Sequence, residues 1–455
     1  MAGVGIELQR ILKRNTFFST LRAYTYAAAL SAGPWIISIV AILAIEILKA
    51  THSGFTVEAS KFQVTAVYLI AISLIFSSFA QQSFTRYMAD HVFHQRFEYV
   101  APNYLAVMLI MTVSSGIFAF PLSFLFFHGE SVLFQLLAAG IFVLLCNIWY
   151  STCLLSGLKN YTLVLFAFLI GYGSAIFLGI HLRFMGAEGL LLGFFIGQFI
   201  LLLSMILTVF FQYPSDRIIE FDIFTKERLF YSFIISSFFY NCAVWVDKFV
   251  FWYSPLTGQV AFDHMHVCVL YDIPMFLSYV AMIPGLAVFL MYIETDFVTF
   301  YDRYYTAITK GYTLSDIYDM RFHMIAAARR GIWAIMRVQT LCLILVYILG
   351  DTILKFLNVS PIHNHVFKID VVGTSLLVMF IAQLNIMSYL DKRLKVLWLC
   401  VLYFVANLVL SIVSIYLGPY FYGYGFTVAT ALVTLIAFML LNYDLDNLEL
   451  QTFMH

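Results

Sequence analysis

Charged residues are scarce in this sequence, since Asp, Glu, Lys and Arg together make up 11% of its 455 residues. A typical soluble domain carries about 25%. Apolar residues reach 62%, and the mean hydropathy is +0.91. These values exclude an ordinary soluble domain and indicate an integral membrane protein. The formal net charge of zero also disfavours a basic nucleic-acid-binding surface.

Motifs for catalysis or metal binding are also missing from the sequence. There is no Walker A motif, which excludes ATP hydrolysis by a P-loop. The six cysteines form no C-x-x-C pair and lie in or beside apolar runs, so we expect them to pack as small hydrophobic residues. Three histidine pairs lack a nearby third ligand: His91 and His94, His264 and His266, and His363 and His365. We therefore expect neither catalysis nor a cofactor or metal.

What the sequence does contain is a series of apolar runs, each long enough to cross a bilayer, which takes about 20 residues. The runs are continuously apolar and lack the alternation of barrel strands, so we expect helices. The predicted spans are 23–48, 64–88, 101–127, 131–157, 161–183, 186–212, 229–253, 267–293, 331–354, 370–390, 394–417 and 424–443. The fold class is therefore an all-α polytopic membrane protein with twelve transmembrane helices.

The basic residues predict the orientation of these helices. Cytoplasmic flanks hold the excess of Lys and Arg. With the N-terminus inside, 19 of the 25 basic residues face the cytoplasm, and Lys248 lies within a span. The remaining five face outside: Lys49, Lys61, Arg183, Lys355 and Lys368. We therefore predict a multi-pass protein with both termini in the cytoplasm.

A polar linker divides the predicted spans into two equal sets. Residues 1–213 form an N-terminal six-helix lobe, 214–228 a cytoplasmic linker, and 229–455 a C-terminal six-helix lobe. Because six is an even number, both halves enter the membrane in the same direction. This is expected of parallel repeats related by an axis along the membrane normal.

The C-terminal lobe contains a cytoplasmic amphipathic segment, 297–330. Thr313 followed by Asp316 is typical of a capping box at a helix start. The next apolar residues share one helical face: Ile317, Met320, Met324 and Ala328. We expect this helix to lie along the membrane interface or against a partner, with Arg329 and Arg330 in the docking surface. A solvated connecting helix without a partner is the alternative.

Two groups of residues predict how individual spans are built. Gly33 and Pro34 interrupt the first span, where Pro removes a backbone donor and clashes with the preceding turn. We interpret the pair as a hinge, with a static kink as the alternative. Gly189, Gly193 and Gly197 recur every four residues, which gives one smooth helix face for close packing.

Charges within spans are the most informative candidate site, because burial in lipid is costly without a partner or water. Asp247 and Lys248 lie in the seventh span, with Asn241 and Trp245 on neighbouring faces, and Asp272 begins the eighth span from the outside. We interpret these residues as lining a substrate pathway; an interfacial anchor is the alternative.

The spacing of the two adjacent charges suggests different roles for them. Successive helical residues are about 100° apart, so we expect that Asp247 and Lys248 cannot face each other. Asp247 is the predicted pathway residue, and Lys248 is predicted to extend outward to the interface.

Several segments carry a resemblance to a known family: "MAGVGIELQRILKRNTFFSTLRAYTYAAALSAGPWIIS", "WVDKFVFW" and "MIPGLAVFLMYIETDF". Over essentially its whole length the chain resembles the PelG family of inner-membrane transporters, of the multidrug/oligosaccharidyl-lipid/polysaccharide (MOP) exporter superfamily. The resemblance implies two six-helix lobes around a central cavity and export of Pel, an N-acetylhexosamine-rich exopolysaccharide. It also implies partners, namely a cytoplasmic glycosyltransferase and small membrane proteins that include a cyclic di-GMP receptor.

Three other functions remain open. A flippase for a lipid-linked oligosaccharide has to hold a pyrophosphate, which favours a deep cluster of Arg or Lys. The deep spans offer only Lys248, beside Asp247, which favours a glycan without a phosphate anchor. A cation-coupled small-molecule antiporter needs an acidic residue in its cavity, for which Asp247 or Asp272 could serve. A scaffold that only anchors a synthase is the third alternative.

Overall fold

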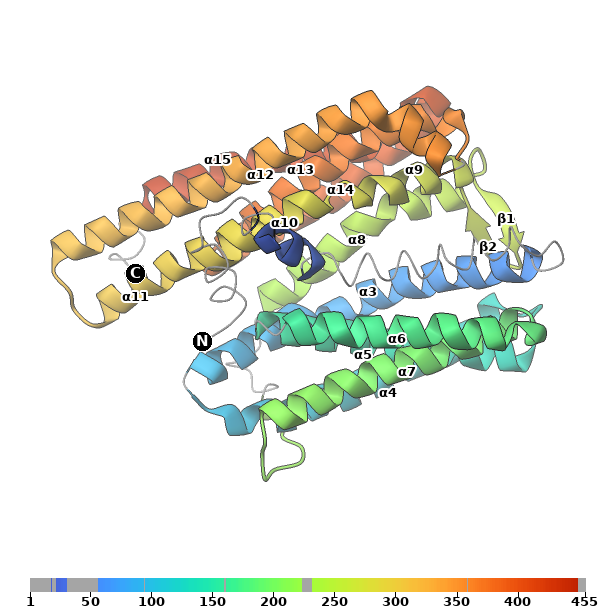
Figure 1. Ribbon diagram of the computed structural model, residues 1–455, viewed down its shortest axis with the longest axis horizontal. Coiled ribbons are helices and arrows are strands. Elements are labelled where there is room, and N and C mark those ends of the chain that lie inside the picture. Colours follow the sequence, from blue (N-terminus) through green and yellow to red (C-terminus); the bar gives the residue numbers. More distant parts are fainter. Residues whose placement is uncertain are drawn as a thin grey trace. The chain divides into compact units, whose positions relative to one another are not determined.

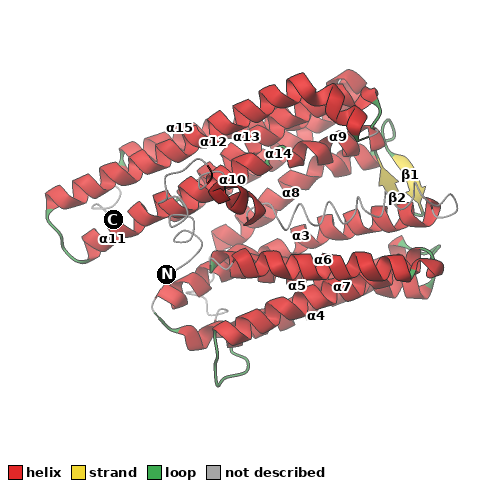
Figure 2. Cartoon of the chain, in the orientation of Figure 1, coloured by secondary structure: helices red, strands yellow, loops and turns green. Residues whose placement is uncertain are grey.

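The computed structural model describes residues 18, 22–30, 56–93, 95–158, 161–222, 231–357 and 359–448. This part of the chain is almost wholly helical (Figures 1 and 2). The helices are α3 (Thr56–Phe93), α4 (Val100–Phe126), α5 (Val132–Gly157), α6 (Tyr161–His181), α7 (Ala187–Gln212), α8 (Tyr231–Tyr253), α9 (Val269–Val280), α10 (Ile283–Met291), α11 (Val298–Thr309), α12 (Leu314–Phe356), α13 (Asn364–Tyr389), α14 (Arg393–Leu417) and α15 (Tyr424–Asp446). A hairpin of two antiparallel strands, β1 (Gln259–Phe262) and β2 (Met265–Val267), joins α8 to α9. Short 3-10 turns are found at Phe97–Tyr99, Arg183–Met185, Pro361–His363 and Pro419–Phe421.

The described residues contain eleven helical segments that are long and apolar enough to span a membrane. Each overlaps one of the twelve predicted spans, so the prediction of these eleven is confirmed. Of the remaining span, 23–48, residues 23–30 are helical. Its other residues, with the predicted hinge at Gly33 and Pro34, lie outside the described part of the chain.

The chain forms two compact units. Among the described residues, the first unit contains 18, 22–30, Val246–Thr257 and everything from Cys268 onward. The second contains 56 to Trp245 together with Gly258–Val267. These units differ from a division at the 214–228 linker in three ways. Residues 18 and 22–30, from the predicted N-terminal lobe, belong to the first unit. The first part of α8 belongs to the second unit, and so does the β-hairpin.

Helix pairing within the units follows a repeat of six spans. In the second unit α5 packs on α3, α4 and α7, and α6 packs on α7. In the first unit α13 packs on α9, α12 and α15, and α14 packs on α15. Each pair in the first unit has its counterpart six spans earlier, because α3–α7 correspond in order to the spans begun by α9, α12, α13, α14 and α15. This correspondence supports the predicted parallel repeat.

The predicted glycine face of α7 is in direct contact with α6. A Cβ on Gly193 would lie 2.6 Å from the backbone nitrogen of Gly179, and one on Gly197 would lie 2.6 Å from the carbonyl oxygen of Gly171. Such contacts let two helix backbones approach closely, which is how helices associate where lipid removes the hydrophobic driving force between them. The prediction of a close-packing face is confirmed.

The predicted amphipathic segment, 297–330, consists of α11 and the first turns of α12. It is therefore part of two long helical stretches and not a separate helix. The apolar stretch Val269–Thr309 runs through α9, α10, a π-helical turn at Tyr292–Phe297 and α11. The capping box is confirmed, because Thr313 Oγ1 accepts a hydrogen bond from the Asp316 backbone N–H at 3.3 Å and α12 starts at Leu314.

The apolar face of the first turns of α12 is covered by this chain itself. Met324 and Ala328 are fully buried, and α12 packs on α11 (Figure 1). The expectation that this face lies on the membrane interface or on a partner is therefore wrong. The reason is that the preceding span extends through α11 and supplies the contact.

The glycine contact predicts a local effect on stability. We expect Gly193→Ala to lower the free energy of unfolding by about 1–3 kcal/mol, because the atoms it meets are backbone atoms of α6 and cannot rotate away. Gly173→Ala on α6 is the matched control, since a Cβ there meets nothing within 4 Å. Thermal unfolding of the purified variants in detergent measures both. Equal midpoints for the two variants would contradict the close approach.

Candidate functional site

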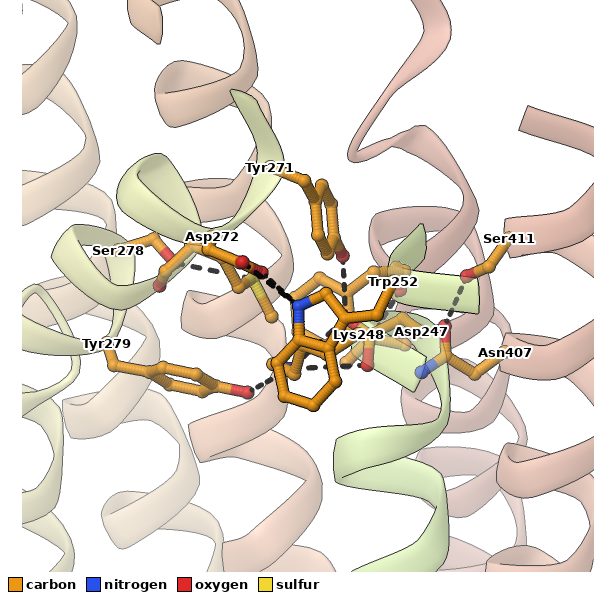
Figure 3. Close-up of polar contacts among 12 residues, drawn as sticks. Asp247, Lys248, Trp252, Tyr271, Asp272, Ser278, Tyr279, Asn407 and Ser411 are labelled. Carbon is orange, nitrogen blue, oxygen red and sulfur yellow. Dashed lines mark hydrogen bonds and ion pairs between the residues drawn. The ribbon is translucent and has the colours of Figure 1, made fainter. Parts of the chain in front are cut away.

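The two charges on α8 form a direct ion pair inside the first unit. Lys248 Nζ lies 3.2 Å and 3.1 Å from Oδ1 and Oδ2 of Asp247 (Figure 3). The same ammonium donates a hydrogen bond to the Tyr279 hydroxyl at 2.9 Å. Asp247 is 0% exposed and Lys248 1% exposed. Both charges are therefore enclosed by protein.

Aromatic residues of α9 and α15 complete the surroundings of the pair. The Tyr271 hydroxyl donates to Asp247 Oδ2 at 2.6 Å (Figure 3). The Lys248 ammonium lies 5.1 Å from the ring centre of Tyr279 and 5.7 Å from that of Phe426, within the range of cation–π attraction. The Asp247 carboxylate thus accepts from Lys248 and Tyr271. The Lys248 ammonium donates to Asp247 and Tyr279 and lies near two aromatic rings.

The expectation that Asp247 and Lys248 cannot face each other is wrong. The 100° separation describes where the Cβ atoms point, but the lysine side chain is long enough to curl back to the preceding residue. Lys248 also does not extend to an interface, because a closer carboxylate and a hydroxyl satisfy its ammonium within the unit.

Asp272 stabilises the start of α9. Its carboxylate accepts the Trp252 indole N–H at 2.9 Å to both oxygens, and Oδ2 accepts the Cys268 backbone N–H at 3.0 Å (Figure 3). A carboxylate in this position satisfies an otherwise free backbone donor and complements the helix dipole. Asp272 therefore joins α8 to the first turn of α9, and its contacts with the ion pair are indirect.

Asn241 and Trp245 lie on the part of α8 that precedes the ion pair. Asn241 donates to the Ser237 carbonyl of its own helix at 3.0 Å, and Trp245 is 6% exposed. Both residues are counted with the second unit, whereas Asp247 and Lys248 belong to the first. The structure therefore brings Asp247 and Lys248 together directly, and it places Asp272 next to Tyr271, which donates to Asp247.

A further buried carboxylate, Asp370 on α13, was missed by the sequence prediction. Asp370 is 0% exposed, and neither of its oxygens has a hydrogen-bond partner among the described residues. It points to the N-terminus of α15, since a Cβ on Gly423 would lie 2.5 Å from Oδ1. Gly423 is the residue before α15 and has φ 87°. The sequence could have identified Asp370 as a candidate, because acidic residues are rare within predicted membrane spans.

The predicted docking arginines have different environments. Arg329 forms an ion pair with Asp446 at 2.9 Å, and Arg321 donates to the carbonyl oxygen of Asp446 at 2.9 Å. These two side chains bind the C-terminal end of α15, where a positive charge complements the helix dipole. Arg330 is exposed. Arg329 therefore has an intramolecular role that the sequence prediction did not include.

Metal-binding geometry is not found in the described residues, which contain no cluster of three His, Cys, Asp or Glu side chains placed to hold an ion. All six cysteines are free, and three of them are buried: Cys146, Cys268 and Cys400. The chemistry of this region is thus that of an ion pair and hydroxyl groups in an apolar surrounding.

The ion pair predicts a double-mutant result. Lys248→Met leaves Asp247 as a buried charge without its cation, and we expect a loss of about 3–5 kcal/mol of unfolding free energy. Asp247→Asn leaves the ammonium unpaired with a similar loss, whereas the double variant recovers most of the stability. Arg393→Met is the control, because the exposed Arg393–Asp391 pair contributes less than about 1 kcal/mol. Thermal unfolding in detergent tests this, and additive losses in the double variant would contradict the pairing.

Comparison with known proteins gives the family and the fold. The sequence matches the profile of the PelG family, described as an exopolysaccharide exporter (EPS-E), over residues 1–453. No curated protein matches the chain.

Solved structures with a similar fold include transporters of the MOP superfamily and its MATE family. An outward-facing multidrug resistance MATE family transporter has a TM-score of 0.66 at 13% identity, covering 93% of this chain and 96% of that chain. A MOP superfamily transporter from Pyrococcus furiosus has a TM-score of 0.64 at 12% identity, covering 93% and 96%. An inward-facing MATE transporter has a TM-score of 0.60 at 13% identity, covering 93% and 95%. The chain belongs to the PelG family of exopolysaccharide exporters and has the fold of MOP superfamily transporters.

Proposed function

We propose that this protein exports an N-acetylhexosamine-rich exopolysaccharide across the bacterial inner membrane, receiving the polymer from a cytoplasmic glycosyltransferase. The family match over residues 1–453 and the transporter fold support this function. The choice of substrate rests on Lys248 of α8, whose charge is balanced by Asp247. This ion pair supports a glycan over a phosphate-anchored lipid.

A flippase for a lipid-linked oligosaccharide requires a cation that is free to bind pyrophosphate in the middle of the membrane. In the described spans, Lys248 is the fully buried basic residue. Its ammonium is already bound to Asp247 and Tyr279. A pyrophosphate would have to break this pair and leave Asp247 as a buried, unpaired anion, which is costly. A polymer of neutral or partly cationic amino sugars has no such requirement.

A cation-coupled antiporter of the same fold is the second candidate, and Asp370 is the observation that favours it. A fully buried carboxylate without a hydrogen-bond donor is unusual, and within a membrane span such a group points to function. Uptake of a cation or proton would satisfy it. This candidate predicts efflux of a small molecule that is lost in Asp370→Asn and needs no polymer synthase.

The experiment compares cells that carry the polymer synthase with or without this protein. We expect secreted polymer to fall at least tenfold when the protein is absent, while intracellular polymer accumulates, because synthesis continues without an exit. Small-molecule efflux and the leaflet distribution of lipid-linked oligosaccharides are measured in the same cells. Unchanged secretion together with a change in either of these would overturn polymer export and select one of the alternatives.

The partner is proposed to dock on the cytoplasmic ends of α11 and α12. Helix α12 has 43 residues, or about 65 Å, against a hydrocarbon thickness of about 30 Å, so a large part of it extends beyond the membrane. Near its start, Leu314, Tyr318 and Phe322 recur every four residues and are 60%, 47% and 69% exposed. An exposed apolar stripe thus lies beside the face covered by α11, as expected of a site that receives a polymer-synthesising enzyme.

This surface predicts a specific loss of binding. We expect Phe322→Asp to reduce co-purification of the glycosyltransferase at least fivefold, because it places a charge at the centre of an apolar contact. Leu394→Asp is the matched control, with 68% exposure at the start of α14 and outside the stripe. Retention of the glycosyltransferase by Phe322→Asp, or equal loss in both variants, would rule out this docking surface.

A further inference from the structure

A groove lies between the predicted cytoplasmic ends of α12 and α15, which run side by side in the first unit (Figure 1). Its volume is about 300 Å³. The lining is mainly apolar and comes from both helices: Ile332, Trp333, Phe438, Leu441 and Leu445. The groove is thus built by contacts within one unit.

A pair of opposite charges lines the polar end of this groove. Arg329 Nη2 lies 2.9 Å from Asp446 Oδ1, and both side chains are exposed. Arg321 donates to the carbonyl oxygen of Asp446 at 2.9 Å and so holds the last turn of α15 on α12. A guanidinium has five N–H donors, and within the described part of the chain Asp446 takes one of those of Arg329. Arg329 can therefore bind an anion without releasing Asp446.

The polar and apolar ends of the groove follow the depth profile of a membrane surface. Arg329 lies just before the predicted span of α12, and Asp446 lies just after that of α15. Trp333 and Phe438 lie within these spans and are exposed. Tryptophan is enriched where the hydrocarbon meets the lipid head groups. The charged end is therefore expected at the level of the head groups and the apolar part at the level of the acyl chains.

The apolar part of the groove continues onto exposed faces of the same two helices. Leu435 and Met439 on α15 are exposed, as are Leu341 and Ile344 on α12. Within a predicted membrane span such faces are covered by lipid. An acyl chain can thus enter the groove directly from the bilayer, whereas a water-soluble ligand has no such route.

The presence of both charges at the polar end selects the kind of head group. A phosphate matches the forked donors of the Arg329 guanidinium. A head group that carries only negative charge would bring a second anion next to Asp446, which is unfavourable. A head group with a phosphate and an ammonium satisfies both side chains.

We propose that this groove binds one aminophospholipid, a lipid whose head group carries an ammonium beside its phosphate. The phosphate binds Arg329, the ammonium binds Asp446, and one acyl chain packs on Trp333 and Phe438. The bound lipid links the last turns of α15 to α12. The site does not depend on which substrate the protein carries.

Native mass spectrometry of the detergent-purified protein tests the choice of lipid. The protein is titrated with phosphatidylethanolamine or with phosphatidylglycerol of the same acyl chains. We expect phosphatidylethanolamine to bind at least fivefold more tightly, and Arg329→Gln/Asp446→Asn to abolish this preference. Arg393→Gln/Asp391→Asn is the matched control, because this ion pair is also exposed to solvent but lies outside the groove. Equal binding of the two lipids by the wild type, or the same loss in both double variants, would overturn the proposal.

Hydrogen exchange tests where the lipid binds. We expect phosphatidylethanolamine to slow exchange of the backbone amides of 438–446 at least threefold in the wild type and to have no such effect in Arg329→Gln/Asp446→Asn. Asn442→Trp fills the groove but keeps both charges, so it should remove the protection as well. Equal exchange with and without the lipid in the wild type, or full protection in the charge variant, would reject the site.

Discussion

A charge inside a membrane-embedded helical unit has to be satisfied by the protein itself, because the hydrocarbon supplies no water and no counter-ion. The ion pair of Asp247 and Lys248 meets this requirement, and the surrounding residues follow from it. Tyr271 and Tyr279 on α9 direct their hydroxyls at the pair. The buried polar groups of α8 and α9 thus fix how these two helices pack in the first unit.

The packing of the other helices follows from the same lack of solvent. In lipid, apolar side chains gain little by meeting each other, so close backbone approach and hydrogen bonds decide which helices associate. Gly193 and Gly197 bring α7 against α6, and Thr374 on α13 donates to the carbonyl oxygen of Ser278 on α9 at 3.1 Å. Because the pairs α3–α5, α4–α5, α5–α7 and α6–α7 recur six spans later in the first unit, one packing scheme serves both halves of the chain.

The sequence was sufficient for features set by local rules. Span length, the α7 glycine spacing and the capping box at Thr313 depend on the bilayer thickness and on neighbours within a helical turn or two. Features that depend on distant residues were missed. The apolar face of α12 was expected to be free, because nothing in its own segment indicates that α11 continues to cover it. The β-hairpin was overlooked, since its strands are stabilised by Tyr68 and Phe134 more than a hundred residues away. Lys248 was misplaced because helix geometry alone ignores side-chain length.

We propose that this protein carries a glycan polymer without a phosphate anchor. The most direct test is to reconstitute the protein and the polymer synthase into proteoliposomes and supply a radiolabelled nucleotide sugar outside. We predict that labelled polymer becomes protected from an added glycosidase only when both proteins are present, with no lipid-linked product in the membrane. Label protected as a lipid-linked oligosaccharide, or polymer that stays fully accessible to the glycosidase, would contradict the account.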